Sequence, residues 1–229
     1  MAPFFSQASL FPVQSILLFG PTGVGKTPLG NAMAEQGLFG RRCHHFDFGS
    51  ELRTAVSNNG LYDSYTFDER AFIQGVLERG LLLENEHFHL AEKILSLFLS
   101  RNKFSSHDIL VLNGIPRHAG QAENIAVAVH IHALIVLDCS SDAVYCRISD
   151  NAGGDRTGRV DDHRDMIRKK LLIFRHRTEP LIAFYEKRDC SVYRIYVTDT
   201  MIPEDVYRVV SSLTAVHPPL PFVAEPPER

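Results

Sequence analysis

The most constraining feature of the chain is a glycine-rich segment between a short apolar run and a helical pattern. It consists of Gly20, Pro21, Thr22, Gly23, Val24, Gly25, Lys26 and Thr27. Its glycines allow consecutive backbone N–H groups to turn inward around an oxyanion. Lys26 can reach the β- and γ-phosphates of a nucleotide, and the hydroxyl of Thr27 can ligate Mg²⁺. The segment therefore predicts a loop that binds a nucleoside triphosphate, with Mg²⁺ as its cofactor.

Short apolar runs alternate with helical patterns along the rest of the chain, which is typical of βαβ units. The pattern predicts an α/β fold with three layers and a parallel sheet, of the P-loop NTPase type. Five strands are expected, at Ser15–Phe19, Cys43–Asp47, Asp108–Leu112, His132–Leu137 and Val192–Val197. A helical pattern over 162–187 contains Pro180, which should kink or break the helix.

Two segments interrupt the alternation and define the expected domain organisation. Residues 48–103 are helical and longer than one crossover needs, and residues 149–162 form a loop rich in Gly, Asp and Arg. We expect one domain over residues 1–216, with its core at 13–47, 104–148 and 163–213, a helical insertion at 48–103 and a lid at 149–162. The proline-rich residues 217–229 are expected to be disordered.

Composition excludes several other classes of protein. The chain has 24 basic and 27 acidic side chains, so no positive field favours nucleic acid or an anionic membrane. The four cysteines include no C-x-x-C pair, which fits a reducing compartment, and we expect a cytoplasmic protein. The first residues lack the basic region of a secretory signal. No nucleic acid or membrane partner is expected, and a monomer is predicted.

Two polar segments follow the second and third predicted strands. Residues 46–53 read FDFGSELR, and residues 113–121 read NGIPRHAGQ. Arg53 and Arg117 therefore lie just past the carboxyl ends of parallel strands, where open α/β sheets bind ligands. Two guanidiniums converging there would clamp a second phosphate, whereas either arginine alone is as readily explained by a surface salt bridge.

These segments together resemble the nucleoside monophosphate kinase family, and in particular an adenylate kinase with a short lid. The family's phosphate loop, its G-x-x-L-R stretch and its G-[FY]-P-R…Q stretch occur here in the same order. The segments GRVDDHRDMIRKKL (158–171) and TEPLIAFYEKR (178–188) are similar to its lid and following helix. The resemblance extends over residues 13–213.

The resemblance implies a role for each matching residue. ATP would be bound by residues 20–27, with Arg147 stacked on its adenine. The acceptor monophosphate would lie against Gly49, Arg53, Gly114, Arg117 and Gln121, of which Gln121 would read the base. The charge of the transferring phosphoryl group would be neutralised by Lys26, Arg117, Arg156, Arg159 and Lys170.

Several positions depart from the family pattern. The family's aspartate before Gly-[FY]-Pro-Arg, which orders Mg²⁺-bound water, is Asn113 here, and two family arginines are replaced by Asn151 and Lys170. Our hypothesis is that Asp47, at the end of the second strand, supplies the missing carboxylate to Mg²⁺. Phe48 places a bulky ring where the family has a small hydroxyl near the acceptor base, which departs from the adenine-binding pattern. AMP is the acceptor that the resemblance implies.

Three functions stay open at this point. The first is a kinase that transfers the γ-phosphoryl group of ATP to a nucleoside monophosphate. The second is a P-loop kinase of another small hydroxyl compound, for which Asp47 would act as a general base. The third is a nucleotide-binding regulatory module with weakened catalysis, which Asn113, Asn151 and Lys170 favour.

Overall fold

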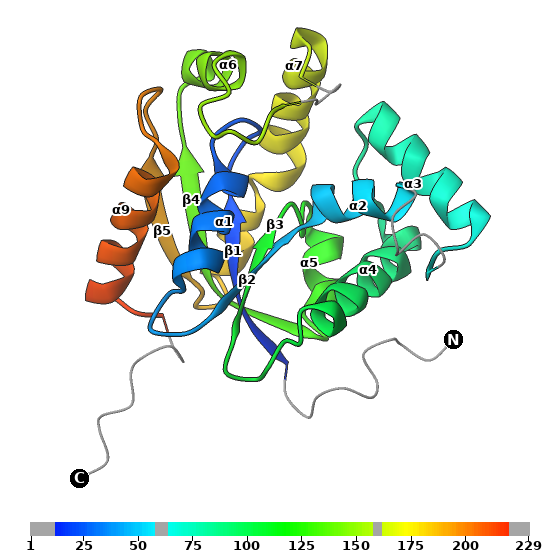
Figure 1. The fold of residues 1–229 in the computed structure, drawn as a ribbon, viewed down its shortest axis with the longest axis horizontal. Coiled ribbons are helices and arrows are strands. Elements are labelled where there is room, and N and C mark those ends of the chain that lie inside the picture. The colour runs from blue at the N-terminus through cyan, green and yellow to red at the C-terminus, as the bar shows by residue number, and fades with distance from the viewer. Residues whose placement is uncertain (1–11, 58–63, 158–161, 220–229) are drawn as a thin grey trace.

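The computed structural model describes residues 12–57, 64–157 and 162–219, and its centre is a five-stranded sheet (Figure 1). The strands are β1 (Val13–Phe19), β2 (Cys43–Asp47), β3 (Ile109–Asn113), β4 (Val129–Asp138) and β5 (Ser191–Tyr196). They lie in the order β2-β3-β1-β4-β5, and every neighbouring pair is parallel. The predicted α/β fold with a five-stranded parallel sheet is confirmed, and all five expected strands are present.

Helices connect the strands and cover the sheet. They are α1 (Lys26–Gln36), α2 (Phe48–Val56), α3 (Phe67–Arg79), the 3₁₀ turn η2 (Asn85–His87), α4 (Phe88–Arg101), α5 (Ala119–Ile125), α6 (Ser141–Ser149), α7 (Arg164–Ile173), the π-helical turn η3 (Phe174–Thr178), α8 (Leu181–Glu186) and α9 (Pro203–Val216). Within the described residues, none of these helices is long and apolar enough to cross a membrane.

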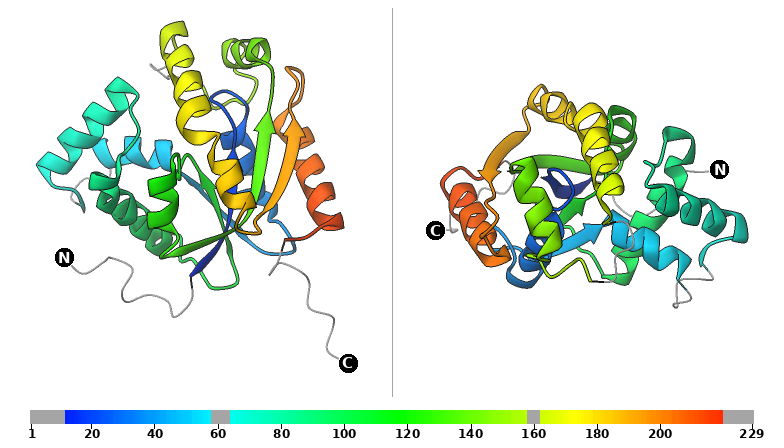
Figure 2. Two further views of the ribbon diagram at one scale, coloured as in Figure 1. Left: turned by 180° about the vertical axis from the view of Figure 1, so that it is seen from behind. Right: turned by 90° about the horizontal axis from the view of Figure 1, so that it is seen from above.

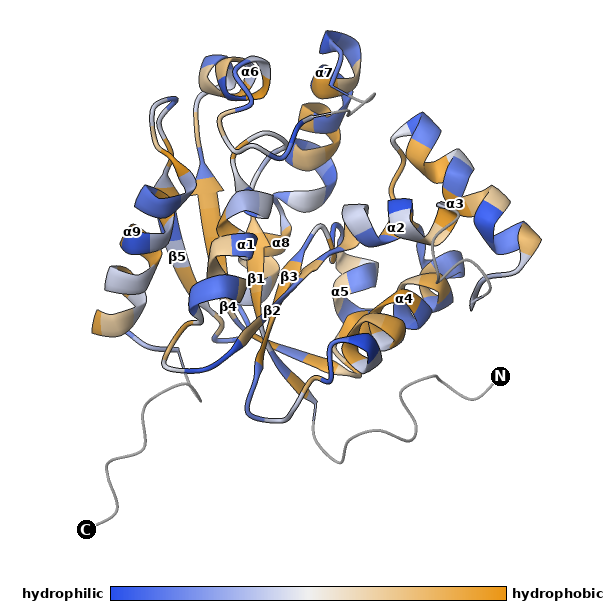
Figure 3. Ribbon diagram, in the orientation of Figure 1, coloured by the Kyte–Doolittle hydropathy of each residue, from blue (hydrophilic) through white to orange (hydrophobic). Residues whose placement is uncertain are grey.

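The sheet is buried on both faces, which fits near-continuous apolar strands in a parallel sheet. On β1, Ile16 and Leu18 belong to a core shared with α1 and α9, whereas Leu17 and Phe19 belong to a core shared with α4, α5 and α8. Figure 2 shows these helices on the two sides of the sheet, and Figure 3 shows the apolar strands between them. This alternation fixes the register of β1 in the sheet, and therefore the position at which the glycine-rich loop begins.

Only part of the segment between β2 and β3 packs on the sheet. Helix α4 packs on the sheet, with the ring of Phe98 5.0 Å from that of Phe46 on β2. Helices α2 and α3 lie farther out (Figure 1). The end of α3 meets α7, because Lys169 Nζ donates to the carbonyl oxygen of Arg79 at 2.6 Å. The helical insertion and the helix after the lid loop are therefore in contact.

The long helical pattern after residue 162 is interrupted, as Pro180 predicts. Helix α7 ends at Ile173, and α8 begins after Pro180, which has no N–H for the preceding turn. Between them lies the π-helical turn η3, which the sequence pattern does not indicate. A π turn changes the direction of successive side chains, and it places Thr178 against the segment that follows β3.

Candidate active site

The phosphate loop connects β1 to α1 in a backbone conformation that requires glycine. Gly20, Gly23 and Gly25 have φ values of 144°, 80° and 107°, a region that L side chains rarely adopt. A Cβ atom at Gly20 would lie 2.3 Å from the carbonyl oxygen of Leu137 on β4. Lys26 folds back over the loop, and its Nζ donates to the carbonyl oxygens of Gly20 at 2.7 Å and Pro21 at 2.6 Å.

Lys26 faces a cavity that concentrates positive charge. Burial lowers the pKa of Lys26 to about 7, and the positive charges of Arg117 and Arg156 act in the same direction. Burial also lowers the pKa of Arg117, and no described residue accepts a hydrogen bond from its guanidinium. All three residues line one cavity. A buried guanidinium without a partner, such as that of Arg117, is unfavourable, so this cavity is suited to an anionic ligand.

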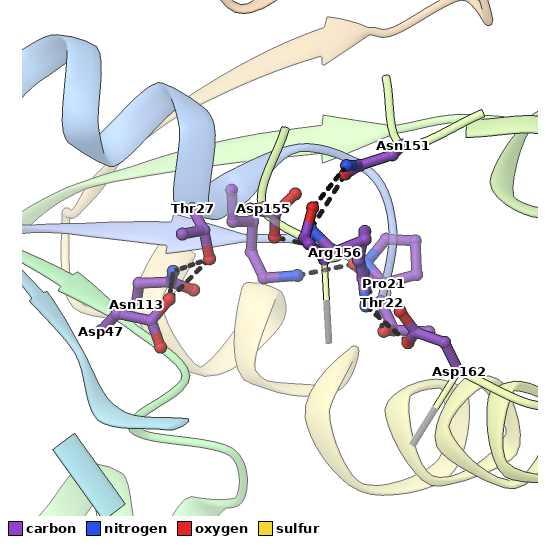
Figure 4. A network of polar contacts seen from close by, with 11 residues as sticks. Pro21, Thr22, Thr27, Asp47, Asn113, Asn151, Asp155, Arg156 and Asp162 are labelled. Carbon is purple, nitrogen blue, oxygen red and sulfur yellow. Dashed lines mark hydrogen bonds and ion pairs between the residues drawn. The ribbon is translucent and has the colours of Figure 1, made fainter. Parts of the chain in front are cut away.

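A compact polar cluster lies where β2 and β3 end beside α1. The register pairs Asp47 with Asn113, and Figure 4 shows both side chains pointing toward Thr27. Thr27 Oγ1 donates to Asp47 Oδ2 at 2.5 Å, and Asn113 Nδ2 lies 3.1 Å from each of these oxygens. Asp47 Oδ1 accepts from the backbone N–H of Ser50 and so caps α2.

The carboxylate of Asp47 is ionised in this cluster. Burial acts to raise its pKa, but the hydrogen bonds from Thr27 and Ser50 lower it, the positive charge of Arg53 lowers it further, and the net result is a pKa below its usual value. Asp47 and Thr27 thus present oxygen donors of the kind that Mg²⁺ prefers. No group of three His, Cys, Asp or Glu side chains suited to a metal occurs in the described parts of the chain. The donor set fits Mg²⁺ that takes its remaining ligands from water and phosphate oxygens.

The cavity continues from the phosphate loop to the segments after β2 and β3. The residues expected to bind the acceptor all line it, namely Gly49, Arg53, Gly114, Arg117 and Gln121. Phe48 and the three leucines at 81–83 add an apolar wall. The structure therefore brings the two predicted phosphate sites into one space, although the residues come from distant parts of the sequence.

Gln121 lies in this wall, and both the oxygen and the nitrogen of its side-chain amide bond to backbone groups. Its Oε1 accepts from the backbone N–H of Arg117 at 2.7 Å, and its Nε2 donates to the carbonyl oxygen of Leu83 at 2.7 Å. The side chain is buried, with 1% of the residue exposed. Gln121 thus ties the turn after β3 to the insertion, and its predicted role in reading a base stays a prediction.

The segment that the sequence predicts to be a lid reaches the phosphate loop through Arg156. Its Nη1 pairs with Asp162 Oδ1 at 2.8 Å, and its Nη2 donates to Thr22 Oγ1 at 3.5 Å (Figure 4). Asn151 supports the same segment, because its Oδ1 accepts from the backbone N–H of Arg156 at 2.9 Å. Lys170 also lines the cavity. Arg159 lies outside the described residues.

Arg147 lies against the phosphate loop but does not itself line the cavity. It is 4% exposed, and its Nη1 donates to the carbonyl oxygens of Thr198 at 2.7 Å and Met201 at 2.8 Å. Its Nη2 would lie 3.3 Å from a Cβ atom at Gly25. In this structure Arg147 braces the loop after β5 against the phosphate loop, and stacking on adenine stays a prediction.

Comparison with curated proteins finds similarity to adenylate kinases. The adenylate kinase of Bacteroides fragilis is 25% identical over 206 residues, which cover 87% of this chain and 99% of that protein. The adenylate kinase of Treponema denticola is 24% identical over 204 residues, 77% of this chain and 88% of that protein. The chain is adenylate kinase-like. A Synechococcus adenylate kinase is 26% identical over 179 residues, 76% of this chain and 85% of that protein, and no family model matches.

Two contacts of the candidate site involve residues that the sequence analysis does not assign to it. His45 Nε2 lies 3.3 Å from Asn113 Nδ2, and Thr178 Oγ1 donates to the carbonyl oxygen of Arg117 at 2.9 Å. The position of His45 two residues before Asp47 was a usable signal, because residues i and i+2 of a strand share a face. No comparable signal exists for Thr178, since η3 alters the helical register.

Proposed function

We propose that this chain is a nucleoside monophosphate kinase, which transfers the γ-phosphoryl group of ATP to a nucleoside monophosphate and yields ADP and a nucleoside diphosphate. The observation that carries the proposal is the single cavity that joins the phosphate loop to Arg53 and Arg117. A kinase of this type needs two phosphate sites in one water-excluding space. AMP is the proposed acceptor, because the similar curated proteins are named adenylate kinases.

The reaction requires positioning and charge neutralisation more than covalent chemistry. The γ-phosphoryl group passes from the β-phosphate oxygen of ATP to a phosphate oxygen of the acceptor. On binding, phosphate oxygens would replace the carbonyl oxygens of Gly20 and Pro21 as partners of Lys26. Arg53 and Arg117 would hold the acceptor phosphate. The equatorial oxygens would be neutralised by Lys26, Arg117, Arg156, Arg159 and Lys170.

Mg²⁺, when bound with ATP, would neutralise charge on the β- and γ-phosphates. Thr27 and Asp47 are the residues that would hold it, directly or through its water. Asn113 would contribute by fixing the carboxylate of Asp47 through the hydrogen bond at 3.1 Å.

The position of the carboxylate can be tested by exchanging it between neighbouring strands. Asp47→Asn should weaken Mg²⁺ binding in the presence of ATP by about 10–100-fold, as losses of comparable metal-site partners do. The double variant Asp47→Asn/Asn113→Asp moves the charge to the paired position on β3 and should recover much of the affinity. Titration of Mn²⁺ by electron paramagnetic resonance measures both. Unchanged affinity in Asp47→Asn would remove Asp47 from the metal site.

A small hydroxyl compound as acceptor is less well supported than a phosphate acceptor. A hydroxyl needs a general base, and Asp47 is the carboxylate that the sequence offers for it. Asp47 already accepts hydrogen bonds from Thr27, Asn113 and Ser50, and its pKa is lowered, so it is a weak base. Arg53 and Arg117 in the cavity also favour an anionic acceptor.

The deciding experiment measures ADP formation from Mg-ATP with AMP, CMP, UMP, GMP and their deoxy forms, with products separated by chromatography. Diphosphate formed from one acceptor supports the kinase and identifies the base. ATP binding without diphosphate from any acceptor contradicts the proposal and leaves a hydroxyl acceptor or a regulatory module. A matched reaction without acceptor corrects for ATP hydrolysis by water.

A further inference from the structure

We propose that His45, held in one tautomer by Asn31, is a positioning residue that orients the side-chain amide of Asn113 at the phosphate-binding end of the cavity. The three side chains form a continuous chain of hydrogen bonds from the outer surface of α1 to the cluster of Thr27 and Asp47. The inference rests on the proposed function only for its effect on catalysis. The orientation itself is a property of the protein alone.

The hydrogen-bond chain permits one assignment of protons. The side-chain nitrogen of Asn113 can only donate, so His45 Nε2, at 3.3 Å, must accept. A neutral imidazole that accepts at Nε2 carries its proton on Nδ1. That proton is donated to Asn31 Oδ1 at 2.9 Å. Asn31 is exposed on α1, and its carbonyl oxygen therefore selects the tautomer of His45.

This arrangement uses both N–H groups of the Asn113 amide. One N–H faces His45, and the other is shared between Thr27 Oγ1 and Asp47 Oδ2, each 3.1 Å from Nδ2. The amide oxygen accepts no hydrogen bond from any described residue, and Asn113 lines the cavity. The cavity therefore meets a fixed acceptor at this point, suited to metal-bound water.

A glycine in the middle of α1 gives independent support. A Cβ atom at Gly30 would lie 2.3 Å from His45 Nε2 and 2.3 Å from its Cδ2. Glycine inside a helix is less stable than alanine by about 0.5–1 kcal/mol. Glycine at this position lowers the stability of the helix locally, and it leaves room for the imidazole ring to lie directly against the helix backbone. Gly30 and Asn31 together hold the ring between α1 and β3.

The first measurement reads the tautomer directly. Long-range ¹H–¹⁵N correlation spectra of the nucleotide-free protein, recorded at pH 8, distinguish protonation at Nδ1 from protonation at Nε2. We expect the Nδ1–H form for His45. The Nε2–H form would overturn the proposal whether or not the protein is a kinase. Conversely, the expected tautomer in a protein that forms no diphosphate would contradict the proposed function and leave the positioning intact.

The second measurement asks whether the orientation matters for the metal. Asn31→Ala removes the acceptor from an exposed position, so the fold should persist. We expect about 10-fold weaker Mn²⁺ binding in the presence of a non-hydrolysable ATP analogue, the lower end of losses seen for such supporting residues. Asn31→Asp keeps the acceptor oxygen and should restore the affinity. Glu35→Ala, exposed on the same helix, is the matched control, and a loss in Asn31→Ala no larger than in this control overturns the proposal.

Discussion

The two ends of the cavity are built in different ways. The phosphate-loop end comes from one continuous segment, in which Lys26 bonds to the carbonyl oxygens of Gly20 and Pro21 only a few residues away. The opposite end, which we propose binds the acceptor, is assembled from distant segments. There, Gln121 bonds to Leu83 across 38 positions, and Thr178 bonds to Arg117 across 61.

This difference separates how the two ends should respond to substitution. A continuous loop keeps its shape through its own backbone, so changing one side chain should remove a function and leave the fold intact. An assembled wall depends on side chains that also connect elements, so substitutions there should alter binding and stability together. The following predictions test this separation.

The largest effect is expected for Lys26→Met. The substitution removes a cation that faces the transferring group and keeps a side chain of similar length. Turnover with Mg-ATP and the best acceptor should fall by at least about 10²–10³-fold, the usual loss for one preorganised donor. Lys187→Met, on the exposed turn after α8, is the control and should retain wild-type turnover. Comparable rates in the two variants would remove Lys26 from the mechanism.

The next effect concerns Arg117 at the acceptor end. Arg117→Ala removes a buried guanidinium that no described residue pairs with, so the loss should appear in ligand binding. The KM for the monophosphate should rise by about 10–100-fold, the equivalent of a charge-assisted hydrogen bond. The KM for ATP should change much less.

Steady-state kinetics with each substrate varied in turn measures this split. Arg194→Ala, which removes an exposed pair with Glu186, serves as the control for loss of an arginine. An equal rise in both KM values would contradict the assignment of Arg117 to the acceptor.

The contrast between the two ends also explains how much the sequence can predict. The strands and the phosphate loop follow from local patterns, because buried parallel strands are apolar and positive φ values favour glycine. The same reasoning placed Arg53 and Arg117 beside the loop, since parallel strands end at one edge of the sheet. These are features that neighbouring residues determine.

The remaining features depend on contacts between distant elements. The π-helical turn brings Thr178 to Arg117, and no helical periodicity encodes it. The two hydrogen bonds of the Gln121 side chain to backbone groups depend on where the segment between β2 and β3 returns to the sheet. The sequence shows that Arg147 is charged but not what it contacts. The carbonyl oxygens that accept its hydrogen bonds come from the loop after β5, whose path depends on the whole fold.

Gln121→Leu tests whether the acceptor wall is also a structural connection. The variant leaves the N–H of Arg117 without its partner and removes one of two contacts to the carbonyl oxygen of Leu83, which also lies 3.1 Å from His118 Nε2. The free energy of unfolding should fall by about 1–3 kcal/mol, the range for unsatisfied buried polar groups. Urea unfolding followed by circular dichroism measures the loss. Gln74→Leu, exposed on α3, is the control, and equal stability of the two variants would limit Gln121 to ligand contact.

The smallest effect is a gain in stability in Lys26→Met, the variant that should lose activity. Lys26 has a folded-state pKa of about 7, below its value in the unfolded chain, because of burial and of Arg117 and Arg156. The unfolded state therefore binds the proton more tightly, and Lys26 lowers stability fully below pH 7 and progressively less as the pH rises toward about 10.4.

Lys26→Met should raise the Tm of the nucleotide-free protein at pH 6.5, by about 2–4 °C for each kcal/mol relieved. The gain should shrink at pH 9.5, as calorimetry of both proteins at both pH values would measure. A gain of the same size at both pH values would show that the added apolar surface, and not the relieved charge, stabilises the variant.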